Sequence, residues 1–403
     1  MRLTAALCLI VATALPVWAD TAVYSGTLGK AAIVVELTED LGQTDAAPAG
    51  RYLYLSKGVD IPLQRVSRTG DTVILAEEEP CPADRCGEGE AAPIAARWTL
   101  TLSEDGNRLT GTWADKRTLP IALTLDAVAA SDAMTPLDLY QRSDRLTYGE
   151  AADITPTTSP YDVLRLDVTL GEGPVEGWPG AQWRMVHDPR TKFPSPRIVT
   201  VAGGPADRAN AVLEQRHWRD SLSAFSCAAL QYAGFNEFGT HPSTDDGTLG
   251  AWDETSAEVQ ALTPTLLSWR ESGSLYCGGA HPANYSNAYV MEVRTGRILS
   301  LADMFTDVVD GKPGPSLKAF IAEKRGTPTN PVDLDYETEC GIPELIVEYL
   351  AASLVRDGDA LSVVFGLQNL PHAINACGDD VLTLPVADVA ALMTPAFAAL
   401  VGR

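Results

Sequence analysis

A cysteine, two glycines and a histidine lie within the five residues 277–281, a combination that could support several kinds of chemistry. Nucleophilic catalysis by Cys277 would need a thiolate and a nearby base, and His281 follows four residues later. In an extended strand, residues four apart share a face but lie about 13 Å apart, which is too far for proton transfer. The two glycines could fold the chain back, so the spacing alone does not decide between a catalytic site, a metal site and a disulfide-anchored hairpin.

Histidine and tyrosine side chains around this segment could instead form a recognition surface. The candidate binding residues are Tyr276, Gly278, Gly279, His281, Asn284, Tyr285 and His372. The alternative is that His281 caps a turn while the tyrosines pack across neighbouring strands. The five histidines show neither an HxH nor an HExxH spacing, so no set of metal ligands can be named. We therefore predict no metal and no cofactor.

The cysteines favour disulfide bonds over a metal site. Cys8 lies in the leader described below, which leaves six, and an even number in an exported chain indicates disulfides. Six cysteines allow fifteen connectivities. Ordering them by proximity gives Cys81–Cys86, Cys227–Cys277 and Cys340–Cys377. Only the first two are close together in sequence, and no histidine accompanies them as a zinc site would require.

Carboxylates are abundant, but no spacing selects a catalytic pair among the 53 acidic residues. The stretch Asp245-Asp246-Gly247 lacks the register of a calcium loop. The glycine-rich segments 171–180 and 201–210 lack the features of phosphate-binding loops. The sequence therefore favours a non-enzymatic protein, and the alternative is an envelope hydrolase that uses carboxylates with His281 or His372.

The first nineteen residues have the pattern of a secretory signal peptide. Arg2 precedes the apolar core Leu3–Leu15, and Val17 and Ala19 suit a cleavage site that would leave Asp20 first. No later stretch reaches about 18 uninterrupted apolar residues. We expect a chain exported to the periplasm or the extracellular space, with no insertion into a membrane.

The chain is strongly acidic. Its net charge is −23, and removal of the leader with Arg2 leaves 29 basic and 53 acidic residues, or 29 − 53 = −24. Such a surface repels nucleic acid and anionic membranes and attracts cationic proteins, basic peptides and divalent cations. We expect no nucleic-acid partner.

Two segments of different character must position the candidate residues. Residues 20–130 alternate apolar and polar side chains between hairpin turns at 68–71 and 104–107, which predicts an all-β meander curled into a sandwich or partial barrel. A linker is expected at 131–159, followed by an α+β domain with an antiparallel sheet and flanking helices at 160–403. Within that domain we expect strands at 161–170, 257–273 and 360–368, a hairpin at 287–300, and helices at 205–235, 315–326, 342–353 and 385–401.

The block 276–305 resembles a motif that begins Y-x-G-G-A-H and continues through a strand to T-G, an acidic residue and F. This motif is typical of the extracellular domain shared by the lysozyme-sensing anti-sigma factor RsiV and the peptidoglycan deacetylase PdaC, where it is not the catalytic part. The resemblance extends over 160–403, with a closing segment at 365–395. The matched positions are Gly278, Gly279, Ala280, His281, Thr295, Gly296, Asp303 and Phe305.

The resemblance implies recognition and not catalysis. We identify neither a membrane helix nor a deacetylase domain, so we expect neither of the two named activities. The leading hypothesis is an exported binding protein that recognises a cationic, lysozyme-like protein or a cell-wall polymer such as peptidoglycan. A third hypothesis is a structural component of the envelope, which a long uncovered edge strand in 20–130 would support.

Overall fold

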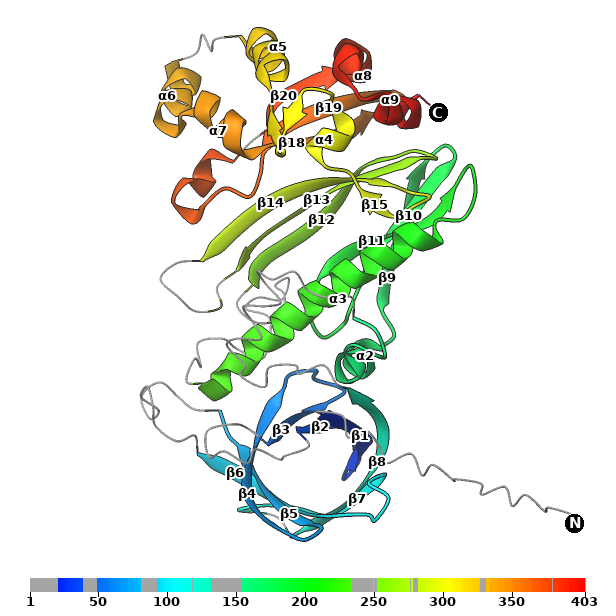
Figure 1. Ribbon diagram of the computed structural model, residues 1–403, viewed down its shortest axis with the longest axis vertical. Helices are drawn as coiled ribbons and strands as arrows, with labels where there is room; N and C mark the ends of the chain where they lie inside the picture. The colour runs from blue at the N-terminus through cyan, green and yellow to red at the C-terminus, as the bar shows by residue number, and fades with distance from the viewer. Residues whose placement is uncertain are drawn as a thin grey trace, which may run out of the picture.

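Two parts of different architecture follow each other along the chain (Figure 1). The computed structural model describes residues 21–38, 49–80, 93–117, 119–131, 154–233, 249, 252–275, 277, 282–326, 331–378 and 380–402. The N-terminal strands form a β-barrel at one end, and the C-terminal sheets and helices occupy the other, with the long helix α3 (Asp207–Ala229) running obliquely between them. This arrangement confirms the expected all-β part followed by an α+β part.

The N-terminal part is a closed barrel of eight antiparallel strands in sequence order. Because β1 (Thr21–Leu28) pairs with both β2 and β8, the expected sandwich or partial barrel is a complete barrel. The turns expected at 68–71 and 104–107 join neighbouring strands. Aromatic and aliphatic side chains fill the interior, as in other eight-stranded barrels. The remaining strands are β2 (Ala31–Thr38), β3 (Gly50–Tyr54), β4 (Ile61–Thr69), β5 (Thr72–Glu78), β6 (Ile94–Leu102), β7 (Arg108–Asp115) and β8 (Ile121–Ser131).

Helix α2 (Pro160–Leu166) stands where sequence alternation predicted a strand, and that prediction was wrong. Pro160 begins the helix, where its missing N–H leaves no intrahelical hydrogen bond unmade. The helical spacing turns Tyr161 and Leu164 toward the barrel. There Tyr161 packs on side chains of the outer face of the barrel, namely Val23, Val34 and Leu53. Packing against a surface distant in sequence therefore decided the conformation.

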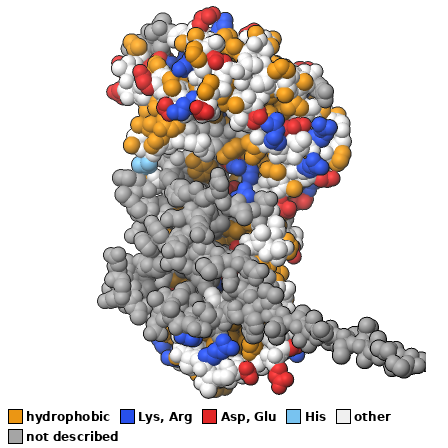
Figure 2. Space-filling model, in the orientation of Figure 1, with side chains coloured by type: hydrophobic (Ala, Val, Ile, Leu, Met, Phe, Trp, Pro, Cys, Tyr) orange, Lys and Arg blue, Asp and Glu red, His pale blue; other side chains and the backbone are white. Residues whose placement is uncertain are grey.

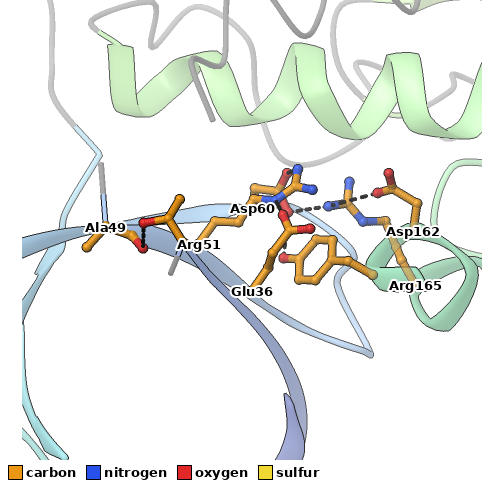
Figure 3. A network of polar contacts seen from close by, with 8 residues as sticks. Glu36, Ala49, Arg51, Asp60, Asp162 and Arg165 are labelled. Atoms are coloured by element: carbon orange, nitrogen blue, oxygen red, sulfur yellow. Dashed lines mark hydrogen bonds and ion pairs between the residues drawn. The ribbon is translucent and has the colours of Figure 1, made fainter. Parts of the chain in front are cut away.

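A buried network of charged side chains joins α2 to the barrel (Figure 3). Asp60 accepts a hydrogen bond from the Tyr161 hydroxyl at 2.8 Å and forms an ion pair with Arg165. Its other carboxylate oxygen accepts from Arg51 Nη1 at 3.0 Å, and Arg51 Nε donates to Glu36 at 2.6 Å. The four charged side chains are at most 3% exposed. One carboxylate thus connects the barrel to helix α2.

Helix α3 (Asp207–Ala229) confirms the helix expected at 205–235 and is followed by η1 (Leu230–Ala233). It packs on two antiparallel sheets through a shared core cluster. The first sheet has the order β11-β10-β9 and the second the order β12-β13-β14-β15. The predicted hairpin at 287–300 is confirmed as β14 and β15. The strands are β9 (Gly171–Trp178), β10 (Ala181–His187), β11 (Pro194–Val201), β12 (Trp252–Leu262), β13 (Leu266–Leu275), β14 (Ala283–Glu292) and β15 (Arg297–Ile298).

The C-terminal elements form a third sheet, β18-β19-β20, with short helices around it. The helix expected at 342–353 is confirmed only to Tyr349, because Leu350 begins β18, and the helix expected at 385–401 is divided into three turns. The elements are α4 (Leu301–Met304), β16 (Val308–Val309), β17 (Lys312–Pro313), α5 (Pro315–Arg325), α6 (Pro331–Cys340), α7 (Ile342–Tyr349), β18 (Leu350–Asp357), β19 (Ala360–Leu367), η2 (His372–Cys377), β20 (Asp380–Pro385), α8 (Val386–Val389), η3 (Ala390–Leu392) and α9 (Pro395–Val401).

Two disulfides follow the predicted pairing. Cys227 bonds to Cys277 and Cys340 to Cys377, with Cα–Cα distances of 5.4 and 5.6 Å. The predicted bond Cys81–Cys86 falls outside the described residues. Disulfides are consistent with an exported protein. Within the described ranges, none of the helices has the length and apolarity needed to span a bilayer.

Candidate binding site

Helix α3 covers one face of the β12–β14 sheet and brings polar side chains against it. Arg216 and Asp220 lie four residues apart and so share one side of the helix. On β13, Trp269 and Glu271 are two residues apart and share the face of the sheet that meets the helix. We use the name α3–sheet site for these residues and their neighbours on β14, a set that comprises Arg216, Asp220, Trp269, Glu271, Tyr285, Asn287 and Tyr289.

Glu271 is held by hydrogen bonds from two side chains. Arg216 Nη2 donates to Glu271 Oε2 at 2.5 Å and Arg216 Nε donates to Oε1 at 3.3 Å. The indole Nε1 of Trp269 also donates to Oε1, at 2.7 Å. Burial alone would lower the pKa of Arg216, but Glu271, Tyr289 and Asp220 together outweigh it and hold that pKa above its ordinary value. The guanidinium is therefore charged at any physiological pH, and Glu271 has a fixed orientation.

Aromatic rings surround this ion pair. The Arg216 guanidinium lies 4.1 Å from the centroid of the Tyr289 ring, within the range of a cation–π interaction. Tyr289 in turn stacks on Trp269 with a centroid distance of 5.1 Å and an interplanar angle of 28°. Trp269 is fully buried, whereas Tyr289 is half-buried. The site thus offers a partly accessible tyrosine on a rigid base.

Asp220 has the most unusual protonation of the site. Burial, and next the nearby Glu271 carboxylate, raise the pKa of Asp220 to about 7, while Arg216 and Arg219 oppose the rise. Two carboxyl groups that share a partly dry site do not both ionise readily. Asp220 therefore exchanges its proton near neutral pH, where a nearby charge can shift it.

Tyr285 and Asn287 complete the site on β14. Tyr285 is half-buried and packs with the cluster that contains Leu275 and Cys277. Burial, followed by Asp220 and Glu271, raises the pKa of Tyr285, so its hydroxyl keeps its proton. Asn287 Oδ1 is buried and accepts no hydrogen bond from a described residue. A buried acceptor left unpaired is costly, and one beside a carboxyl pair is a candidate contact for a ligand.

Comparison with known proteins gives a structural similarity at low sequence identity. No family model matches the chain, and no curated protein matches it significantly. Among solved structures, the chain is similar to a crystal structure of a DUF3298 family member from Bacteroides fragilis NCTC 9343, determined at 2.30 Å resolution. The two share 13% identity over 58% of this chain and 98% of that chain, with a TM-score of 0.32.

The predicted binding residues fall into three groups. Tyr276, Gly278, Gly279 and His281 lie outside the described residues. Tyr285 belongs to the α3–sheet site.

Asn284 and His372 belong together at a different place. Asn284 points to the face of β14 opposite to Tyr285, since neighbouring residues of a strand alternate. Its carbonyl oxygen accepts a hydrogen bond from Asn375 Nδ2 at 2.5 Å. Asn375 lies in η2, the short helix that His372 begins and that Cys377 fastens to Cys340. The structure therefore brings Asn284 to the helix of His372, and not to Tyr285.

Sequence reasoning missed Arg216, Asp220, Trp269 and Glu271. A signal for the first two exists in the spacing of α3. Arg216 and Asp220 continue the stripe of Leu213, Ala224 and Cys227, which are buried and three or four residues apart. Polar residues inside such a stripe must meet polar partners. Across the described ranges, no group of three or more His, Cys, Asp or Glu side chains could hold a metal ion.

Proposed function

We propose that this chain is an exported, non-enzymatic binding protein whose α3–sheet site contacts a cationic protein partner. The observation that carries the proposal is a cluster of half-buried tyrosines with a carboxyl pair, fixed on a helix and a sheet, beside a buried Asn287 oxygen that accepts no hydrogen bond from the described residues. Tyrosine and arginine at a preorganised site are the side chains that dominate binding energy in protein interfaces. The resemblance of 160–403 to the domain of RsiV and PdaC supports a lysozyme-like partner.

Net charge supports encounter with such a partner but does not define the site. A charge of −23 attracts a cationic protein over a distance and speeds association. Figure 2 displays acidic and basic side chains interspersed over the C-terminal elements, with no single acidic field on this face. Specificity would therefore come from short-range contacts at the site.

The test is calorimetric titration of the chain, residues 20–403, with lysozyme at physiological salt. Cytochrome c is the control of similar positive charge. Binding to lysozyme alone supports the proposal, whereas equal binding to both proteins reduces it to net charge. Absence of binding to either removes this partner class and directs the titration to peptidoglycan fragments.

Two conservative variants locate the contact. Asp220→Asn and Tyr285→Phe keep the side-chain shape and are expected to weaken binding by about tenfold, as loss of an interface hot spot does. Asp310→Asn and Tyr336→Phe, which change exposed residues of the β16–β17 turn and of α6, should leave affinity unchanged. A partner cation beside Asp220 would also lower its pKa, so binding at pH 7 should release a proton in the wild type but not in Asp220→Asn.

One observation favours a second candidate, an acid–base hydrolase of the cell wall. A carboxyl group with a pKa near 7 beside a second carboxylate is suited to general acid–base catalysis. The pair would be Asp220 and Glu271, in place of carboxylates that act with His281 or His372. Peptidoglycan turnover that Asp220→Asn abolishes, with no loss of the folded state, would favour this candidate over the first.

A third hypothesis, a structural component of the envelope, rested on an edge strand that the described barrel does not have. It needed a long uncovered edge strand in 20–130, but the pairing of β1 with β8 closes the described strands of the barrel.

A further inference from the structure

One buried carboxylate stands apart from the others in the described part of the chain. The buried acidic residues are Glu36, Asp60, Glu77, Asp162 and Asp188. Four of them lie within ion-pair distance of an arginine: Glu36 and Asp60 of Arg51, Asp162 of Arg165, and Asp188 of Arg190. Glu77, only 7% exposed, forms no ion pair with any described residue. A buried charge without a counter-charge is costly, and proteins keep one where a ligand or reaction uses it.

Glu77 lies inside one end of the barrel among aromatic rings. The indoles of Trp98 and Trp113 both donate to Glu77 Oε2, at 3.0 and 2.7 Å. These hydrogen bonds fix the carboxylate in place but bring it no positive charge. Tyr52 packs edge-on against Trp98 at a centroid distance of 4.9 Å and against Tyr54 at 5.5 Å. The carboxylate is thus fixed within an aromatic wall.

Two more tyrosines lie near Glu77 at this end. The buried Tyr52 hydroxyl is within hydrogen-bonding reach of Glu77 and Tyr54, which together with burial raise its pKa, although its contacts with described residues depart from ideal hydrogen-bond geometry. Tyr232 of η1 lies near the same groups. Burial raises the pKa of its phenol most, and the nearby Glu77 and Tyr54 raise it further. At the opposite end the interior tyrosine is satisfied, since Tyr24 donates to the Gly106 carbonyl oxygen at 3.4 Å.

We infer that this end of the barrel binds a small organic cation that carries an alkylammonium group. Glu77 supplies the counter-charge, and the half-buried rings of Tyr54 and Trp113 supply the faces that attract an ammonium group through cation–π contacts, with the fully buried Tyr52 and Trp98 packed behind them. The Tyr52 hydroxyl can accept a hydrogen bond from a primary amine. Tyr54, Trp113 and Tyr232 are only half-buried, so the described residues do not seal the site. The mouths of small barrels commonly hold one such ligand.

The inference is independent of the proposed function, because it concerns the barrel interior and not the α3–sheet site. It assigns the N-terminal barrel a ligand of its own, at the end of the barrel that Tyr232 of η1 approaches.

The test is a titration of the whole chain with tetramethylammonium and n-butylammonium chloride, followed by NMR of the indole N–H signals of Trp98 and Trp113. Their neutral counterparts of the same heavy-atom count, tert-butanol and n-butanol, serve as controls at matched ionic strength. Saturable shifts at millimolar concentration with the cations alone are expected. A preference for n-butylammonium would point to a primary amine, and a preference for tetramethylammonium to a quaternary one.

Glu77→Gln should weaken cation binding at least about tenfold, because the amide can still accept from the indoles but carries no charge. Glu104→Gln is the matched control, because Glu104 is an exposed carboxylate in the turn between β6 and β7, at the opposite end of the barrel. Its affinity should equal that of the wild type. Absence of saturable shifts with either cation, equal shifts with the alcohols, or unchanged affinity in a folded Glu77→Gln variant would each overturn the inference.

Discussion

At the scale of single residues, Asp220 couples the α3–sheet site to pH. Its pKa, raised to about 7 by burial and Glu271, lies well above that of an aspartate in an unfolded chain. Between about pH 4 and pH 7 the folded state therefore holds a proton that the unfolded state has released. The stabilising contribution is complete below about pH 4 and is lost as the pH rises through 7.

Asp220→Asn should accordingly remove a fall in the free energy of unfolding, on the order of 4 kcal/mol, between pH 4 and pH 7. Urea denaturation at several pH values measures it, as the difference between variant and wild type. The difference between variant and wild type is needed because His217 acts in the opposite sense. Burial, and next Arg197, lower the pKa of His217 to about 4. The contribution of His217 to the free energy of unfolding therefore grows as the pH rises from 4 to 6.5. A variant curve parallel to that of the wild type would contradict the assignment.

At the scale of elements, helix α2 depends on its contacts with the barrel. Arg165 is fully buried and pairs with Asp60, which also holds Arg51 and Tyr161. Removing one member of such a network leaves a buried charge without its partner. Arg165→Met should lower the free energy of unfolding by about 3–5 kcal/mol, measured by urea denaturation.

The barrel also contains a matched control for this change. Arg108 pairs with Asp126 on the surface, where their side chains are 57% and 59% exposed. Arg108→Met should cost no more than about 1 kcal/mol, because water already screens an exposed pair. Similar losses for the two variants would mean that the Asp60 network does not hold α2 in place.

Some helices, turns and disulfides could be predicted from the sequence alone, and others could not. The barrel turns, α3 and the β14–β15 hairpin were predictable because their signals are local: glycine turns, helical spacing and alternation. Helix α2 was not, because its seven residues fit either pattern and the barrel surface decided between them. The disulfide order was predictable because each described pair is also the nearest in sequence.

Of the candidate site, the sequence predicted only the part that lies on β14. Tyr285 was found from the composition of one segment, whereas Asp220 and Glu271 lie 51 residues apart, by 271 − 220, and share a site only through the packing of α3. Among 53 acidic residues, no one-dimensional spacing could have paired these two. The position of Glu77 could not be predicted either, because only the fold shows that no described residue forms an ion pair with this buried carboxylate.

At the scale of the whole molecule, α3 ties the two parts together. Its first half packs on the β12–β14 sheet, and near its end Phe225 contacts Gly58 of the barrel. Arg190, which donates to the carbonyl oxygens of Leu55 and Arg165 at 2.8 Å, also lies over the Phe225 ring. Barrel and C-terminal part therefore share buried contacts that neither could satisfy alone.

We expect the wild type to unfold in a single calorimetric transition, because these contacts couple the two parts. Gly58 has a φ of +76°, and a Cβ there would lie 2.4 Å from the Phe225 ring, so Gly58→Ala adds both strain and a clash. This variant should separate the transition of the barrel from that of the remainder. Gly29→Ala, at a similar φ of +62° but with no atom within 4 Å, is the control that carries strain alone and should keep one transition at a lower temperature. Two separate transitions already in the wild type would mean that the barrel folds independently, and that the Asp60 network and Phe225 merely bring two autonomous domains into contact.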